Sequence, residues 1–223
     1  MSLGHGPSIV LNGLKVYVDA ANMKSYPGSG SNWFDLSGNG VNGELINGIT
    51  YDTQNNGGLV FNGTDNYCRF VFSNKGIFVK QGTTICAFIF RTKTVTSQTN
   101  LISYRYGAGG QLYIGSLNNQ IFSFYNSLDT PGYTSGLFPL NQFAYVTVRL
   151  NNDGSITHMT NGTNKFTSPI RTGYNTSEKT EFRFSSDLEF FGGLMFSFQH
   201  YDRELSDLEI QQNFNALRGR YGI

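Results

Sequence analysis

The sequence predicts an all-β fold, an antiparallel two-sheet jelly-roll sandwich that a short C-terminal α-helix closes. Charged residues make up 14% of the chain and aromatic residues 15%, and the chain contains 27 glycines. Short stretches of alternating apolar and polar residues recur, separated by pairs of turn-forming residues. Few charges, many aromatics and many turn residues are typical of short strands joined by tight turns, and not of helical bundles.

Asparagine followed by glycine is the recurring turn signal. Such pairs begin at Asn12, Asn39, Asn42, Asn47, Asn56, Asn62 and Asn161, and Asp153-Gly154 adds a close relative. Because asparagine and glycine both tolerate positive φ, these pairs suit the tight turns of β-hairpins. We therefore expect turns at these positions and strands between them.

Strand patterns fill the stretches between the turns. Residues 15–19, 144–150 and 194–199 alternate apolar and polar side chains, as half-buried strands do. Residues 84–90 are apolar on both faces, which predicts a central strand covered on each side. Residues 111–125 break into two short strands. The chain is thus predicted to form about ten to twelve strands, a number typical of a sandwich or barrel.

The C-terminal part carries a helix signal. Ser206, followed three residues later by Glu209, forms a capping box in which each side chain bonds to the backbone of the other residue. We expect a helix from about residue 207 to residue 218, ended by Gly219 and packed on the sandwich. Its predicted apolar face comprises Leu208, Phe214 and Leu217.

Length and hydropathy predict a single domain, residues 1–223, that does not insert into a membrane. No linker divides the chain, and 223 residues suit one large all-β domain. Residues 1–13 lack a charged segment followed by an apolar one, so no signal peptide is predicted. No apolar run approaches the roughly 18 residues that a transmembrane helix needs.

Charge and cysteine content exclude further classes of function. The net charge is +1 and the basic residues are scattered, so the sequence gives no electrostatic case for nucleic-acid binding, which normally uses a basic face. Cys68 and Cys86 lie in apolar strand-like runs. We favour two buried thiols over a disulfide, since no secretory signal is present. Neither cysteine has the spacing of a metal site.

Three segments together resemble a known family. The first runs over residues 19–40 and includes WFDLSGNG at 33–40, the second is VFNGTDNY at 60–67, and the third includes FGGL at 191–194 and YDRELS at 201–206. In this order they resemble the concanavalin A-like lectin/glucanase superfamily, and within it the laminin-G-like jelly rolls. Residues 213–223 are similar to the C-termini of such domains in tailed-phage virion proteins. The resemblance spans nearly the whole chain and implies the fold, but lectins, adhesion modules, virion proteins and hydrolases all share it.

The resemblance also indicates what a catalytic member would need. Glucanases of the superfamily carry Glu-x-Asp-x-(x)-Glu on one strand, where a period of two places the carboxylates on one face. Glu204, Asp207 and Glu209 have the wrong spacing, and the pair Asp187 and Glu189 lacks a third acid. We therefore expect no enzymatic activity, and glycan hydrolysis is the least favoured function.

Glycan binding would use exposed aromatic rings with amides or acids beside them. The candidates are Tyr104, Tyr106, Tyr125, Asp129 and Tyr133, in the polar, loop-rich middle of the chain. The alternative is that these tyrosines are half-buried strand residues with hydroxyl groups in water. Trp33 has two interpretations as well: a buried ring beside a turn held by Asp35 and Ser37, or a sugar-stacking platform.

Calcium is the one cofactor that the resemblance suggests, because many relatives bind it. The candidate ligands are Asp19, Asp35 and Asp65, which lie near predicted loops. Calcium requires several carboxylate and carbonyl oxygens, and no EF-hand spacing occurs here. Turn capping explains Asp35 and Asp65 equally well, so both interpretations stay open.

The sequence thus favours a non-catalytic binding or assembly module. The resemblance implies a tailed-phage virion structural protein, such as a decoration, fibre or tail-associated protein, made in the host cytoplasm and located in the virion. It would contact other virion proteins, form a homo-oligomer and bind a host-surface glycan. The alternative is a lectin-like carbohydrate-binding or adhesion domain outside a virion.

Overall fold

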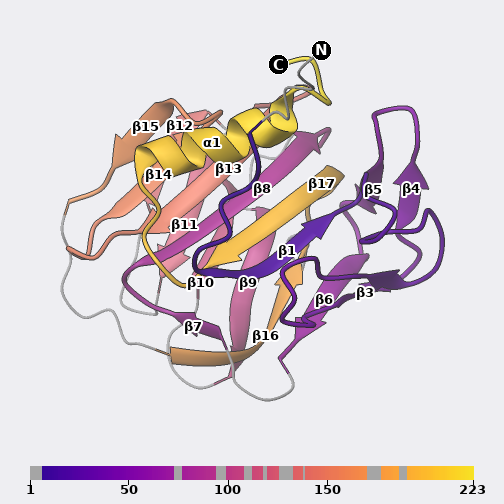
Figure 1. Cartoon of the computed structure of the whole chain (residues 1–223), viewed down its shortest axis with the longest axis horizontal. Coiled ribbons are helices and arrows are strands. Elements are labelled where there is room, and N and C mark those ends of the chain that lie inside the picture. The colour runs from indigo at the N-terminus through magenta and orange to yellow at the C-terminus, as the bar shows by residue number, and fades with distance from the viewer. Residues whose placement is uncertain are drawn as a thin grey trace, which may run out of the picture.

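Two antiparallel sheets face each other, and one helix lies across the outer face of one sheet (Figure 1). The computed structural model describes residues 7–72, 77–93, 99–107, 112–117, 120–125, 133–137, 139–169, 177–185 and 190–223. The predicted all-β sandwich with a C-terminal helix is therefore confirmed. Among the residues so described, no helix is both long and apolar enough to cross a bilayer.

The helix-covered sheet contains the central strand that the sequence predicts. Its order is β15 (Asn164–Thr167), β14 (Ile156–Thr160), β13 (Phe143–Leu150), β8 (Thr83–Arg91), β17 (Gly192–Tyr201), β5 (Gly58–Asn62) and β4 (Thr50–Asp52), and β1 (Leu14–Asp19) also pairs with β17. Strand β8 lies between β13 and β17, and eight of its nine residues are buried. Its two apolar faces serve two cores, one between the sheets and one beneath the helix.

The second sheet supplies the opposite wall of the main core. Its order is β12 (Tyr133–Leu137), β11 (Gln120–Tyr125), β10 (Leu112–Leu117), β9 (Thr99–Gly107), β16 (Ser177–Phe184), β6 (Tyr67–Val71), β3 (Gly43–Ile46) and β2 (Asn32–Trp33), and β7 (Ile77–Val79) pairs with β16. Strands β10 and β11 are the two strands predicted within residues 111–125.

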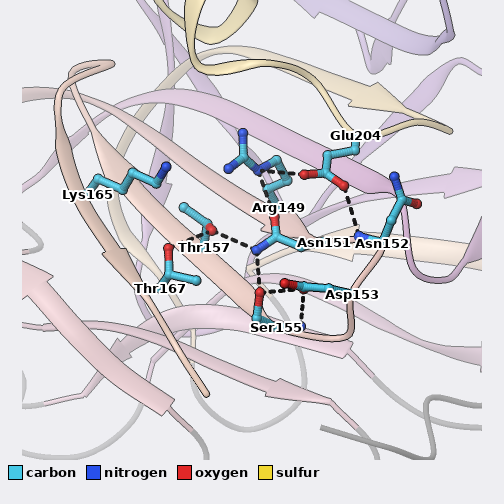
Figure 2. A pocket seen from close by; sticks show the side chains of 9 residues that line it. All are labelled: Arg149, Asn151, Asn152, Asp153, Ser155, Thr157, Lys165, Thr167 and Glu204. Carbon is cyan, nitrogen blue, oxygen red and sulfur yellow. Dashed lines mark hydrogen bonds and ion pairs between the residues drawn. The ribbon is translucent and has the colours of Figure 1, made fainter. Parts of the chain in front are cut away.

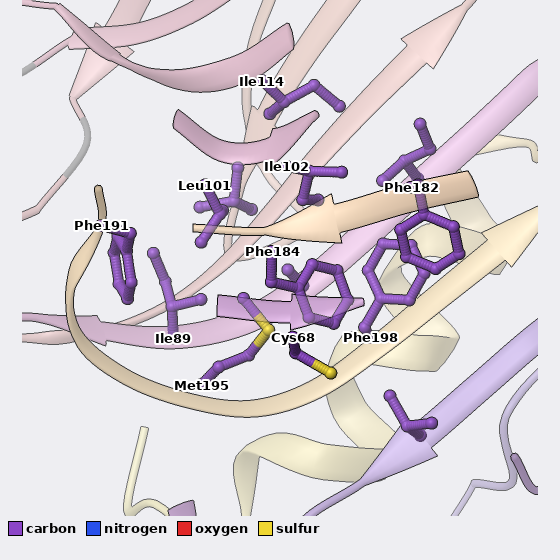
Figure 3. Packing of buried hydrophobic residues seen from close by; sticks show 14 of the residues in the cluster. Cys68, Ile89, Leu101, Ile102, Ile114, Phe182, Phe184, Phe191, Met195 and Phe198 are labelled. Carbon is purple, nitrogen blue, oxygen red and sulfur yellow. The ribbon is translucent and has the colours of Figure 1, made fainter. Parts of the chain in front are cut away.

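Aromatic rings fill the space between the sheets (Figure 3). The ring of Phe182 stacks on Phe70 at 4.5 Å between centroids, and Phe184 meets Phe198 edge-on at 4.7 Å. Trp33 is fully buried and packs edge-on against Phe184. The burial of the Trp33 ring confirms its structural interpretation and rules out a sugar-stacking platform.

The turn after Trp33 is held as predicted. Asp35 Oδ1 accepts hydrogen bonds from the backbone N–H of Tyr17 and of Ser37, both at 2.9 Å. Its Oδ2 accepts from Ser37 Oγ at 2.7 Å and from the N–H of Val41 at 3.2 Å. The carboxylate of Asp35 therefore joins β1 to this loop.

Both cysteines are buried and free, so the prediction of two separate thiols is confirmed. Burial raises the pKa of the Cys86 thiol to about 11. A thiol with so high a pKa is inert, because the thiolate is the reactive form.

Helix α1 (Asp207–Arg218) begins with the predicted capping box. Ser206 Oγ accepts from the N–H of Glu209 at 3.2 Å, and the Glu209 carboxylate accepts from the N–H of Ser206 at 2.9 Å. The predicted apolar face is wrong at Leu208, which is 77% exposed. The buried side chains are those of Ile210, Asn213, Phe214 and Leu217. At 100° per residue, Leu208 points away from this face.

The helix also ends differently from the prediction. Gly219 has φ −59° and ψ −23°, which is right-handed, so the helix does not end in a left-handed glycine. The chain continues in tight turns to Tyr221, whose ring packs against Phe88 and Phe196. This apolar anchor, and not the glycine, fixes the C-terminal segment to the sheet.

Tyr201 and Arg203, in and after the last strand, tie it to the helix. Arg203 forms an ion pair with Glu209 at 2.5 Å, and Tyr201 accepts a hydrogen bond from Asn213 Nδ2 at 3.0 Å. The hydroxyl of Tyr201 also donates to the backbone oxygen of Val10 at 2.9 Å. The N-terminal segment, β17 and α1 therefore meet at one end of the sheet.

Candidate functional site

A polar pocket of about 370 Å³ opens beside the N-terminus of α1, at the β15 edge of the helix-covered sheet (Figure 2). We call it the Arg149 pocket. Nine residues line it: Arg149, Asn151, Asn152, Asp153, Ser155, Thr157, Lys165, Thr167 and Glu204. All nine have polar side chains, although the strands that supply four of them belong to a sheet that borders two apolar cores.

Strand alternation explains how polar groups reach this face. On β13, Val146, Val148 and Leu150 belong to the core between the sheets. Arg149 lies between two of these residues and therefore points to the opposite face. A tight turn with Gly154 at φ 89° then leads into β14, as the Asp153-Gly154 pair predicts.

Arg149 is the centre of the pocket floor and is only 7% exposed. Its Nε donates to Asn151 Oδ1 at 2.7 Å. Its Nη1 donates to the backbone oxygen of Leu205 at 2.7 Å and to Asp207 Oδ1 at 2.8 Å. Glu204 Oε1 lies 3.8 Å from Nε. A buried guanidinium needs such partners, because desolvation of an unpaired charge is costly.

Asn151 links Arg149 to the hydroxyl groups of the floor. Its Nδ2 donates to Ser155 Oγ at 2.7 Å and to Thr157 Oγ1 at 2.8 Å. The hydroxyl of Thr157 in turn lies 3.0 Å from that of Thr167 on β15. Hydrogen-bonded networks of this kind hold side chains in one arrangement, so the floor is rigid.

The rim of the pocket is exposed and offers both donors and acceptors. Lys165 Nζ pairs with Asp207 Oδ2 at 2.9 Å. Asp153 Oδ1 accepts from the N–H and the Oγ of Ser155, at 2.8 and 2.6 Å. These two hydrogen bonds lower the pKa of Asp153. Glu204 Oε2 accepts from the backbone N–H of Asn152 at 2.8 Å.

Tyr104, the first predicted glycan contact, is fully buried. Its hydroxyl lies 2.7 Å from His200 Nδ1, and its ring stacks on Phe182 at 5.0 Å. Burial lowers the pKa of His200 to about 3, so the pair is neutral and structural. The prediction of Tyr104 as a glycan contact is wrong, because no ligand reaches a side chain enclosed by the core.

Three of the other predicted glycan contacts belong to the second sheet, which supplies none of the residues that line the Arg149 pocket. The backbones of Tyr106, Tyr125 and Tyr133 lie on β9, β11 and β12, at the same end of this sheet. Tyr125 pairs with Leu112, which pairs with Tyr104. Asp129 lies outside the described residues.

The aspartates predicted to bind calcium have separate partners. Asp19 is buried, pairs with Arg220 at 2.5 Å and accepts from the Tyr17 hydroxyl at 3.0 Å. The Asp35 carboxylate holds the turn after Trp33, and Asp65 Oδ1 accepts from Asn62 Nδ2 at 2.7 Å. In the described part of the chain, no three Asp, Glu, His or Cys side chains gather as a metal site. The three candidate aspartates therefore do not gather in one cluster, and calcium binding stays a prediction.

Asp207 and Glu209, two of the acids considered as catalytic residues, form ion pairs with basic side chains. Asp207 contacts Arg149 and Lys165, and the hydrogen bonds from these two residues lower its pKa. The hydrogen bond from Arg203 is the main cause that lowers the pKa of Glu209 to about 2. Asp187 and Glu189 lie outside the described residues.

Sequence reasoning missed the Arg149 pocket, although it located the strands. A signal was present: Arg149 ends the polar face of a strand and is followed by the polar run Asn151 to Ser155. What the sequence does not show is that Glu204 and Asp207, more than fifty positions later, lie against this arginine.

A comparison with models of protein families identifies the superfamily of this chain. Residues 62–211 match the model of the concanavalin A-like lectin/glucanases superfamily. The chain belongs to this superfamily. A comparison with curated protein sequences finds no match.

Solved structures show the same fold at low sequence identity. The sialidase of Trypanosoma rangeli in complex with the inhibitor DANA matches with a TM-score of 0.69 and 15% identity, over 93% of this chain and 33% of the sialidase. Domain 4 of AbnA, a GH43 extracellular arabinanase from Geobacillus stearothermophilus, in complex with arabinotriose, matches with a TM-score of 0.68 and 16% identity, over 91% of this chain and 98% of that domain. The binding domain of botulinum neurotoxin DC in complex with SialylT matches with a TM-score of 0.71 and 15% identity, over 93% of this chain and 52% of the neurotoxin chain. This superfamily member thus spans about a third of the sialidase.

Proposed function

We propose that this chain is a non-catalytic glycan-binding module whose binding site is the Arg149 pocket. The observation that carries the proposal is a rigid polar floor with an exposed rim of donors and acceptors in a single hollow. Its volume of about 370 Å³ falls in the range of small-molecule sites, roughly 300–1,000 Å³. A sugar presents several hydroxyl groups at once, each of which donates and accepts hydrogen bonds.

Preorganisation supports binding at this pocket. The hydrogen bonds among Arg149, Asn151, Thr157 and Thr167 fix the floor before any ligand arrives. A fixed site spends less binding energy on ordering side chains. AbnA domain 4, which this chain matches over 98% of that domain, was solved with arabinotriose. That structure supports a binding role for an isolated domain of this fold.

The carboxylates of the pocket favour binding over hydrolysis. A glycosidase needs one carboxylic acid with a raised pKa and a second carboxylate across the scissile bond. Asp153 and Asp207 both have lowered pKa values. Groups that stay ionised at neutral pH are hydrogen-bond acceptors for sugar hydroxyls and not proton donors.

A glycan array followed by isothermal titration calorimetry tests the proposal. Lys165→Met, at the exposed rim, should weaken binding of the best array glycan by about tenfold, the loss of one charged hydrogen bond. Lys24→Met is the matched control, since Lys24 is exposed in the loop after β1. A flat array contradicts glycan binding, and equal affinity of both variants contradicts the location.

We further propose that the module belongs to a tailed-phage particle, where it docks on other virion proteins as a homo-oligomer. The similarity of residues 213–223 to the C-termini of virion proteins supports this placement. Mass spectrometry of purified particles should detect the chain at structural copy number. Its absence from the particles, with glycan binding retained, would instead favour a lectin outside a virion.

A further inference from the structure

We infer that the Arg149 pocket selects uncharged glycans and discriminates against glycans that carry a carboxylate, such as sialylated ones. This inference rests on the proposed glycan-binding function and names the class of ligand for the same site. Three features of the pocket carry it: its sum of charges, the partners of its two cations, and the hydrogen-bonding groups that remain for a ligand.

The charges of the pocket sum to a negative value. Arg149 and Lys165 supply two positive charges. Asp153 and Glu204 line the pocket, and Asp207 pairs with both cations, so three carboxylates face two cations. A ligand carboxylate would enter an environment with one excess negative charge, and like charges at close range repel.

Both cations are already occupied by protein carboxylates. Asp207 bridges them, with Oδ1 at 2.8 Å from Arg149 Nη1 and Oδ2 at 2.9 Å from Lys165 Nζ. Those two cations lower the pKa of Asp207, so it stays ionised at neutral pH. Because Asp207 already neutralises part of both positive charges, an acidic sugar gains less from an ion pair with Arg149 or Lys165 than it would from an unpaired cation.

The groups that remain for a ligand suit hydroxyls. Arg149 Nη2 carries two N–H groups, and among the residues that the structure describes it makes no hydrogen bond. The rim carboxylates of Asp153 and Glu204 accept hydrogen bonds. A hydroxyl accepts from the guanidinium and donates to a carboxylate, whereas a ligand carboxylate only accepts. A neutral sugar therefore satisfies both kinds of group.

Paired oligosaccharides that differ in one sialic acid test the inference, for example lactose and 3′-sialyllactose together with arabinotriose and maltotriose. On an array with titration calorimetry, the best neutral glycan should bind at least about tenfold more tightly than its sialylated counterpart. A preference for the sialylated member overturns the inference and leaves glycan binding intact. No binding by any neutral or acidic glycan contradicts the proposed function itself.

Charge variants separate repulsion from shape. Asp153→Asn and Glu204→Gln each keep a side-chain oxygen acceptor and remove one negative charge from the rim. Each variant should reduce the ratio of the affinity for a neutral glycan to the affinity for its sialylated counterpart several-fold. High salt should reduce this ratio further. Glu44→Gln, at an exposed acid on β3 of the second sheet, is the matched control and should leave the affinity ratio unchanged. If the affinity ratio is unchanged in both rim variants, the electrostatic basis of the inference is wrong.

Discussion

At the scale of single residues, Arg149 explains why a polar pocket persists on an apolar sheet. It is nearly buried, yet two acids and two oxygen acceptors surround its guanidinium. Exposed ion pairs contribute little to stability, whereas removal of one partner from a buried pair leaves an uncompensated charge. Arg149 is therefore expected to be structural for the fold as well as part of the proposed site.

Arg149→Met should lower the free energy of unfolding by about 2–3 kcal/mol, since it breaks three hydrogen bonds to a charged group in a largely buried setting. Urea denaturation measures the loss. Arg69→Met is the matched control, because Arg69 pairs with Glu44 at an exposed position and should change stability by less than about 1 kcal/mol. Equal losses in the two variants would show that the Arg149 network does not stabilise the fold.

Glu209 should make stability depend on acid pH. Its pKa is lowered to about 2 in the folded protein, mainly by the hydrogen bond from Arg203, and is about 4.3 in an unfolded chain. The carboxylate thus stabilises the fold fully above about pH 4.3, and this contribution is lost as the pH falls toward 2. Glu209→Gln should be less stable than the wild type at pH 7 and equally stable near pH 2, as measured by urea denaturation. A stability difference that does not change with pH would contradict this role.

At the scale of elements, the sequence was most informative where one local pattern decides the structure. The alternation in residues 144–150 and the two-sided apolar run at 84–90 predicted β13 and β8, and the capping box predicted α1. The predicted apolar face of α1 was wrong at Leu208, because packing decides which face of the helix lies on the sheet. The sequence also predicted two strands within residues 111–125, but not β9, on which Tyr104 faces inward onto His200.

Gly115 on β10 is the position where an element depends on a missing side chain. A Cβ at this residue would lie only 1.7 Å from the backbone oxygen of Thr99 on β9, at a shift in register. Gly115→Ala should therefore separate β9 from β10 and destabilise the protein by more than about 2 kcal/mol.

Gly219→Ala is the matched control for Gly115→Ala. Nothing lies within 4 Å of the added Cβ, and φ is −59°, so stability should stay the same or rise by up to about 1 kcal/mol. Thermal unfolding of both variants checks the pair. A tolerated Gly115→Ala would mean that β9 and β10 do not pair in this register.

At the scale of the whole molecule, the sandwich brings together groups that are far apart in the chain. The pocket combines β13, β14 and β15 with Glu204, from the connection between β17 and α1, and Asp207, the first residue of α1, pairs with its arginine. Composition, turns and the family motifs predict the sandwich, because they follow from short-range patterns. The pocket depends on how the C-terminal segment packs against β13, which only the tertiary structure shows.

Glycan binding at the Arg149 pocket can be tested with a crystal structure of the protein bound to the best neutral glycan from the array. We expect the glycan within hydrogen-bond distance of Arg149, Asp153 and Lys165. A glycan seated instead on the second sheet, beside Tyr106, Tyr125 and Tyr133, would contradict it.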